Sequence, residues 1–316
     1  MVKRAIVAKD RVNKQMKRVG GLVGCQMPDE MATKADATQS LLGCLMVIGG
    51  AEDRASDCRL LQAFAELCGG NSARIVLITT ASGRPAQSFA MYQAAFRRIG
   101  TDDVRELWLD SHEQANSDET LATLAQATGI FFTGGDQARL QFLARSRAIS
   151  TLRRLVADGS LAVAGTSAGA TALGPVMILG GNVRGGGEDR DGDDRDDQDD
   201  RDAAEDPLRM GPGLGLLPAS VVDVHFTQRT RLPRLVAAVT RHPSHLGIGI
   251  DEDTAALVRS GRFDVLGRGE VVTVDAVSAA DPPAESAGSG ERVPGIRLHR
   301  LRTGDAFDLA RRHPIT

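Results

Sequence analysis

The chain has 316 residues, 42% of them hydrophobic and only 3% aromatic, and carries a formal net charge of −3. This length can bury a sizeable core, as one large or two smaller domains, and the core has to be built from Ala, Val, Leu and Ile. Such a composition is typical of a mostly parallel α/β sheet, whose buried strands are aliphatic.

Composition also bears on location and partners. The chain has no apolar run of about 18 residues, the length that crosses a membrane, and its N-terminal segment is too charged for a secretory signal. We therefore expect a soluble cytoplasmic protein with no membrane partner. The four cysteines include no C-x-x-C pair and are expected to be reduced, structural thiols.

The charge is unevenly distributed. Residues 188–206 contain twelve acidic side chains and three arginines, a net charge of −9, so the rest of the chain sums to +6. We expect no nucleic-acid partner, because the basic excess has no interleaved aromatic residues to stack on bases and the acidic block would repel phosphates.

The predicted elements begin after a polar stretch, residues 1–40, which is expected to form a loose leader. A single domain is expected over 41–316, in which aliphatic strands alternate with helices. Strands are predicted at 42–48, 73–80, 104–109, 129–132 and 161–165, and helices at 51–67, 87–99, 120–128 and 137–157. This alternation predicts a parallel, doubly wound sheet that binds ligands at the carboxyl ends of its strands.

The second half of the chain is less regular. A short strand at 176–179 precedes a charged, glycine-led insertion at about 183–207, which is expected to be disordered because it offers too little apolar surface to bury. A calcium loop is the alternative, but D-R-D-G-D at 189–193 has glycine at the fourth position and not the sixth, so we expect no metal. Further elements are predicted at 220–226, 235–240, 246–250, 255–258, 262–266, 271–274 and 296–310, with a Pro/Gly/Ser-rich loop before the last.

The strand at 161–165 leads into G-T-S-A-G at 165–169 and then into a helix-forming stretch. Glycines on both sides of Ser167 permit the sharp turn of a nucleophile elbow, which presents a serine hydroxyl at the end of a sheet. Ser167 is therefore the candidate nucleophile. The alternative is that these small residues only allow the strand and helix to pack closely.

Gly49 and Gly50 also lie between a predicted strand and a helix, as in a dinucleotide site. The sequence G-G-A-E-D-R lacks the third glycine and puts Glu52 and Asp53 where a pyrophosphate would lie. We expect neither NAD nor FAD here. The two acids are instead expected to begin the helix and complement its dipole.

The strand at 220–226, S-V-V-D-V-H-F, places Asp223 and His225 on one side. Three arginines follow within six residues, at 229, 231 and 234. Arginines at a helix N-terminus oppose the helix dipole, so we expect them to bind an anionic ligand, although a solvated basic helix start is the alternative. The next strand ends in acids at 251–253, and a carboxylate there could orient a histidine that activates a serine.

Four motifs follow one another along the chain: F-T-G-G-D-Q at 132–137, G-T-S-A-G-A at 165–170, D-V-H-F-T-Q-R-T-R-L-P-R-L at 223–235 and G-I-G-I-D-E-D-T-A at 247–255. In this order they resemble the motifs of the cyanophycinases, relatives of aspartyl dipeptidase (peptidase E). The similarity covers about 42–258 and is far more specific than one elbow. It implies a three-layer α/β/α sandwich with a mostly parallel sheet, of the flavodoxin-like type shared with class I glutamine amidotransferases, usually as a homodimer. It also implies hydrolysis of cyanophycin, a poly-aspartate with arginine on each β-carboxyl, to β-Asp-Arg dipeptides, without metal or cofactor.

The resemblance also implies roles for individual residues. Ser167 is the nucleophile, His225 the base and Glu252 the third member, with Asp251 and Glu188 as alternatives for that third place. The oxyanion would be held by backbone N–H groups of Ala168 and of Gly134 or Gly135. The substrate pocket would be formed by Gln137, Asp223, Arg229, Arg231 and Arg234.

Two departures from the family pattern are visible. Val224 stands where the family usually has Gln, which removes one polar contact, and the acidic insertion is longer than the family's loop, so Glu188 has no safe alignment. Three alternatives share the same fold: an Asp-X dipeptidase of the peptidase E type, an amidotransferase-like hydrolase and a non-catalytic binding protein. Amidotransferases have cysteine at the elbow, and this chain has serine.

Overall fold

The computed structural model describes residues 43–181, 207–277 and 295–315, all within one compact unit, Ala37–Thr316. The leader expected at 1–40 lies outside these residues. So do nearly all of the acidic insertion, including Glu188, and the loop expected at 278–294.

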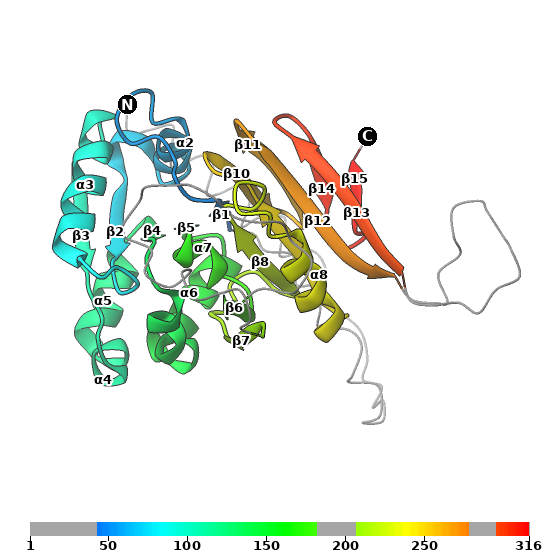
Figure 1. Cartoon of the computed structure of the whole chain (residues 1–316). Helices are drawn as coiled ribbons and strands as arrows, with labels where there is room; N and C mark the ends of the chain where they lie inside the picture. Colours follow the sequence, from blue (N-terminus) through cyan, green and yellow to red (C-terminus); the bar gives the residue numbers. More distant parts are fainter. Residues whose placement is uncertain (1–42, 182–206, 278–294, 316) are drawn as a thin grey trace, which may run out of the picture. The chain divides into compact units, whose positions relative to one another are not determined.

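The largest sheet in the described residues has nine strands, in the order β15-β14-β11-β10-β1-β5-β4-β2-β3 (Figure 1). Pairing is parallel from β1 to β3 in this order and antiparallel from β1 to β15. The strands are β1 (Leu45–Ile48), β2 (Arg74–Ile78), β3 (Asp103–Leu107), β4 (Gly129–Phe132), β5 (Ala162–Thr166), β10 (Thr254–Arg259), β11 (Arg262–Gly267), β14 (Ala306–Asp308) and β15 (His313–Ile315).

The sheet is therefore mixed, and the mostly parallel arrangement expected from the sequence holds only from β1 to β3. The reason lies in the connections. Only Ser260 and Gly261 join β10 to β11, both with positive φ (50° and 77°), as in a tight two-residue hairpin. A parallel pair would need a crossover of a dozen or more residues, so this short link forces antiparallel pairing.

Two smaller sheets complete the β structure. Four strands pair in the order β13-β12-β9-β8: β8 (Ser220–Val224), β9 (Leu246–Ile250), β12 (Glu270–Val277) and β13 (Gly295–Arg302). The other sheet pairs β6 (Val176–Gly180) with β7 (Arg209–Pro212). The parallel neighbours β8 and β9 both end toward the serine-bearing end of β5, which brings their following residues to one site.

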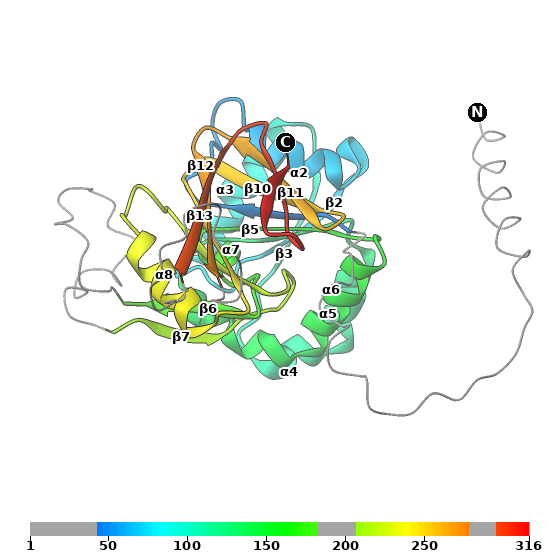
Figure 2. The same cartoon turned by 90° about the vertical axis from the view of Figure 1, so that its right-hand side faces the viewer.

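The helical elements are α2 (Arg59–Leu67), α3 (Pro85–Arg98), α4 (His112–Asn116), α5 (Asp118–Gln126), α6 (Arg147–Ala157), α7 (Ala168–Thr171) and α8 (Leu232–Arg241), with 3₁₀ turns η1 (Gly70–Ser72) and η2 (Gln137–Arg145). α8 packs on the four-stranded sheet through Leu235, Ala238 and Val239 (Figure 2).

The large sheet is covered on both faces, as its strand pattern predicts. Alternate residues of β1 enter two separate cores: Leu45 and Val47 pack with α5, α6, β8 and β9, whereas Met46 and Ile48 pack with α2 and α3. The central strands are apolar along almost their whole length because neither of their faces meets water.

Two helix predictions are wrong, each because a short polar side chain binds the backbone. The helix expected at 51–67 begins only at Arg59, since the Asp53 carboxylate accepts hydrogen bonds from the N–H groups of Ala55, Ser56 and Cys58 and holds a turn. Asp53 therefore does not complement a helix dipole. The helix expected at 137–157 divides at Ser146, whose hydroxyl caps α6 by accepting from the Ile149 N–H.

Candidate active site

Ser167 lies at the turn between β5 and α7, with φ 50° and ψ −120°. Residues other than glycine rarely adopt this backbone conformation, and close packing around Ser167 maintains it. A Cβ on Gly165 would lie 2.6 Å from the Gly169 carbonyl oxygen, and one on Gly169 would lie 2.4 Å from the Phe132 carbonyl oxygen. Both glycines of the G-x-S-x-G pattern are therefore needed on steric grounds.

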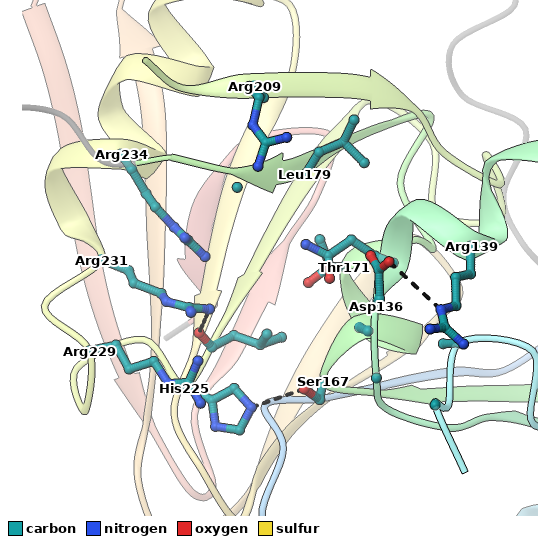
Figure 3. A pocket seen from close by; sticks show the side chains of 17 residues that line it. Asp136, Arg139, Ser167, Thr171, Leu179, Arg209, His225, Arg229, Arg231 and Arg234 are labelled. Atoms are coloured by element: carbon teal, nitrogen blue, oxygen red, sulfur yellow. Dashed lines mark hydrogen bonds and ion pairs between the residues drawn. The ribbon is translucent and has the colours of Figure 1, made fainter. Parts of the chain in front are cut away.

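The structure brings Ser167, His225 and Glu252 together from the ends of β5, β8 and β9. The Ser167 Oγ lies 3.0 Å from His225 Nε2, and His225 Nδ1 lies 2.7 Å from Glu252 Oε1 (Figure 3 shows the serine–histidine contact). The imidazole thus lies between a hydroxyl and a carboxylate. This is the nucleophile, base and orienting-acid arrangement of a serine hydrolase.

The neighbouring acid, Asp251, has a different role. One of its carboxylate oxygens accepts from the Thr227 N–H and hydroxyl at 2.9 and 2.8 Å, and the other accepts from the Glu270 N–H at 3.0 Å. Asp251 therefore joins three loops and is buried among them. Of the two alternatives to Glu252, Asp251 is engaged elsewhere and Glu188 lies outside the described residues.

Burial lowers the pKa of His225 below its ordinary value, and this effect exceeds the opposing one of the hydrogen bond to Glu252. The positive charges of Arg229 and Arg231 lower the pKa further. The imidazole is consequently neutral near pH 7. A neutral imidazole can accept the serine proton, which is the condition for general-base catalysis.

The predicted oxyanion residues lie around the nucleophile. Ala168 begins α7, so its N–H has no acceptor within the helix. A Cβ on Gly134 would lie 3.2 Å from Ser167 Cβ, which places the loop after β4 directly against the serine. Gly135 has φ 136°, and a Cβ there would lie 2.1 Å from the Ala81 carbonyl oxygen, so this position also requires glycine.

Ser167 and His225 open into a cleft of ≈360 Å³. One wall carries four arginines, and Asp136 and Arg139 lie opposite (Figure 3). The four arginines are Arg209 from β7 and Arg229, Arg231 and Arg234 from the segment after β8. This concentration of positive charge suits a ligand with carboxylates.

The sequence expectation for Asp223 needs correction. Asp223 does not line the cleft and is fully buried behind the arginines. It accepts from Arg234 Nε at 2.7 Å and Arg234 Nη2 at 2.5 Å, and Arg231 Nη1 lies 3.5 Å away. The reason is that β8 is buried along its whole length, so a carboxylate on it needs cationic partners. Asp223 therefore orients the arginines.

The other residues expected in the pocket do line it. Gln137 is in the wall, with its amide nitrogen donating to the Ile178 carbonyl oxygen at 3.0 Å. Val224 also lines the pocket but is almost fully buried, and its carbonyl oxygen accepts from Arg231 Nη1 at 2.9 Å. Asp136 and Arg209 also line the cleft and are not among the residues predicted from the sequence. Asp136 had a signal, since it lies inside the F-T-G-G-D-Q motif, whereas Arg209 reaches the cleft only through the β6–β7 pairing.

The described residues hold neither a metal-binding cluster nor a membrane-spanning helix. They contain no group of three or more His, Cys, Asp or Glu side chains arranged to hold a metal ion. Within the same residues, every helix is too short or too polar to cross a membrane.

Comparisons with known proteins match the geometry. The model of peptidase family S51 matches residues 45–266. The chain is 38% identical over 282 residues to the cyanophycinase of Trichormus variabilis, covering 87% of this chain and 88% of that protein. It is 37% identical over 281 residues to the cyanophycinase of Synechococcus elongatus, covering 86% and 81%.

A solved structure shares the fold. The crystal structure of a peptidase from an acI-B1 Actinobacterium superimposes with a TM-score of 0.59 at 19% identity, covering 85% of this chain and 98% of that one. These similarities confirm the resemblance that the four motifs indicated. The chain belongs to peptidase family S51 and is a cyanophycinase-like peptidase.

Proposed function

We propose that this protein is a serine exopeptidase that hydrolyses cyanophycin to β-Asp-Arg dipeptides. The observation that carries the proposal is the hydrogen-bonded series Ser167–His225–Glu252 beside a cleft that has four arginines on one wall. The serine, histidine and glutamate provide the hydrolysis, and the arginines select a substrate rich in carboxylates.

The reaction follows from the positions of these groups. His225 Nε2 takes the proton from Ser167 Oγ as the oxygen attacks the scissile carbonyl, and Glu252 stabilises the imidazolium that forms. Backbone N–H groups of Ala168 and of Gly134 or Gly135 stabilise the oxyanion. His225 then protonates the leaving amine, and the acyl-enzyme is hydrolysed by a water molecule that the same histidine deprotonates.

The charge pattern of the cleft supports selection of the β-Asp-Arg unit. Each unit carries a carboxylate and a guanidinium on the side chain of its backbone aspartate. The carboxylate is suited to the arginine wall, where planar guanidinium groups can bind it through two hydrogen bonds. An unmodified peptide lacks both charges at this spacing.

We assign the substrate guanidinium to Asp136. Among the described residues that line the cleft, Asp136 is the single carboxylate, since Asp223 is enclosed by arginines. Its Oδ1 accepts from the Ala138 N–H at 2.7 Å, and its Oδ2 lies 3.8 Å from Arg139 Nε. That ion pair is long and partly exposed, so a substrate guanidinium can compete with Arg139 for the carboxylate.

The alternatives differ in chemistry. An Asp-X dipeptide carries two carboxylates but no fixed guanidinium, so it would leave Asp136 without the cationic group that we assign to it. An amidotransferase-like hydrolase would have cysteine at the elbow. A non-catalytic binding protein would have no use for a histidine held between serine and glutamate. The three-layer sandwich of the amidotransferase type, the homodimer and the cytoplasmic location remain predictions.

The test is an assay of the purified full-length protein on cyanophycin, with products identified by mass. We expect β-Asp-Arg as the product and casein to remain intact. Ser167→Ala and His225→Ala should each lower turnover by about three orders of magnitude or more while the melting temperature stays near that of the wild type. Near-normal activity of the serine variant, or efficient casein cleavage, would refute the proposal.

A further inference from the structure

The segment Gly49–Asp53, which follows β1, contacts the backbone or a neighbouring residue of each of the three catalytic side chains. It contains the glycine pair that resembles a dinucleotide turn and a buried carboxylate, Glu52, that the mechanism above does not use. Packing of helices against the large sheet does not account for the glycine pair or for the buried carboxylate. Its contacts with the nucleophile, the base and the acid can be traced separately.

The segment is linked to the nucleophile from two directions. The Ser167 N–H donates to the Ile48 carbonyl oxygen at 3.2 Å, immediately before the segment. The hydroxyl of Thr166, the residue preceding the nucleophile, donates to Glu52 Oε2 at 2.6 Å. The other oxygen of Glu52 accepts from the Tyr92 hydroxyl, and Arg54 Nη1 lies 3.9 Å from it.

Glu52 is only 2% exposed. A buried carboxylate is costly unless hydrogen bonds and a cation compensate it, and replacing such a group by apolar residues is often neutral or stabilising. Stability alone therefore gives little reason for a charge here. Its second acceptor oxygen instead restrains the side chain of Thr166, and through it the backbone that enters the elbow.

The catalytic base, His225, contacts the same segment. The His225 N–H donates to the Gly49 carbonyl oxygen at 2.9 Å. Gly50 has φ 97°, and a Cβ built on it would lie 2.3 Å from His225 Cε1 and 2.5 Å from Nε2. The imidazole thus lies directly over the Cα of Gly50, at the ring edge that faces Ser167.

The acid is held through its neighbours. The Asp253 N–H donates to the Gly50 carbonyl oxygen at 2.9 Å, and the Asp53 N–H donates to Asp253 Oδ1 at 3.1 Å. The Gly49 N–H donates to the Thr254 carbonyl oxygen at 2.9 Å. These three bonds fix the turn that carries Glu252.

We propose that Gly49–Asp53 is a positioning element that sets the nucleophile, the base and the acid relative to one another, with Gly50 and Glu52 as its positioning residues. The inference rests on the proposed serine mechanism. Ser167, His225 and Glu252 follow three different strands, and this one short segment bonds to Thr166 beside the nucleophile, to the backbone of His225, and to Asp253 and Thr254 beside Glu252. Displacing a reacting group by about 1 Å can cost about 100-fold in rate, so such a link has direct consequences for turnover.

The decisive experiment compares Gly50→Ala with Gly304→Ala. The two glycines have nearly the same φ, 97° and 96°, so both substitutions place alanine at an unfavourable positive φ, but Gly304 has no atom within 4 Å of the added Cβ. We expect Gly50→Ala to lower kcat on cyanophycin by about 100-fold with KM changed less than about twofold, because the added methyl group displaces the His225 imidazole and leaves the arginines that bind the substrate in place. Gly304→Ala should keep wild-type kcat and KM.

Labelling of Ser167 by a fluorophosphonate probe supplies a readout that does not depend on cyanophycin. Its rate should fall in parallel with kcat for Gly50→Ala and stay unchanged for Gly304→Ala. Equal kcat values and labelling rates for the two variants would overturn the inference. If Ser167→Ala retains activity, it is the serine mechanism itself that fails, so the two failures are distinguishable.

A second pair of variants decides the matter if Gly50→Ala does not fold. Thr166→Val keeps the shape of the side chain and removes the donor to Glu52, whereas Thr166→Ser keeps the donor. We expect the valine variant to lose about tenfold in kcat at unchanged KM, as for a displacement below about 1 Å, and the serine variant to recover most of it. Wild-type kcat in the valine variant would overturn the role of Glu52.

Discussion

Replacing Asp223 with Asn tests whether a buried ion pair holds the arginine wall of the cleft. Asp223 is 0% exposed, and its partners Arg231 and Arg234 are 8% and 7% exposed. Arg234 donates two hydrogen bonds to the carboxylate, at 2.7 and 2.5 Å. Asparagine preserves the size of the side chain but removes the charge and one of the two acceptor oxygens.

The expected effect is large because water cannot replace the lost partner. Breaking a buried ion pair by removing one member costs about 3–5 kcal/mol in the free energy of unfolding. For a large domain each kcal/mol lowers the melting temperature by about 2–4 °C, so we expect a decrease of about 6–20 °C. KM for cyanophycin should rise as well, since Arg231 and Arg234 lose the group that orients them.

The assay is thermal unfolding together with steady-state kinetics, and Asp103→Asn is the matched control. Asp103 also binds an arginine through two hydrogen bonds, from Arg105 at 2.8 and 3.1 Å, but this pair is exposed. The control should melt close to the wild-type temperature, because exposed ion pairs contribute little. Equal changes in melting temperature for the two variants would refute the argument from burial.

Three further predictions concern the site. The acidic limb of kcat/KM should have its midpoint below pH 6.5, because burial lowers the pKa of His225 and the base works only above that pKa; a midpoint above 6.5 would contradict this. Glu252→Gln should move the midpoint further down, since it weakens the hydrogen bond that raises the pKa, and should lower turnover less than His225→Ala does, as a pH profile of the variant would reveal. Arg229→Ala and Asp136→Asn should each raise KM for cyanophycin, whereas the exposed Arg97→Ala should not; equal KM values for all three would remove the cleft as the binding site.

Local sequence patterns predicted many elements well. The strands at 129–132 and 246–250 have the predicted bounds, because short apolar runs between turn residues leave few alternatives. Helix boundaries failed where a side chain competed with the backbone, at Asp53 and Ser146. Hydrophobic periodicity cannot predict these boundaries, because it depends on the spacing of apolar residues and not on hydrogen bonds from polar side chains to the backbone.

The sequence by itself determined what depends on neighbouring residues. Gly165 and Gly169 permit the turn that presents Ser167, and the alternation of aliphatic runs determined an α/β sheet. Only the tertiary structure decided which acid faces His225, that Asp223 lies behind the arginines, and that Glu52 reaches Thr166 from 114 positions away. Packing decides these contacts because backbone sterics and side-chain period act over a few residues, whereas burial and charge pairing depend on which segments the whole fold brings together.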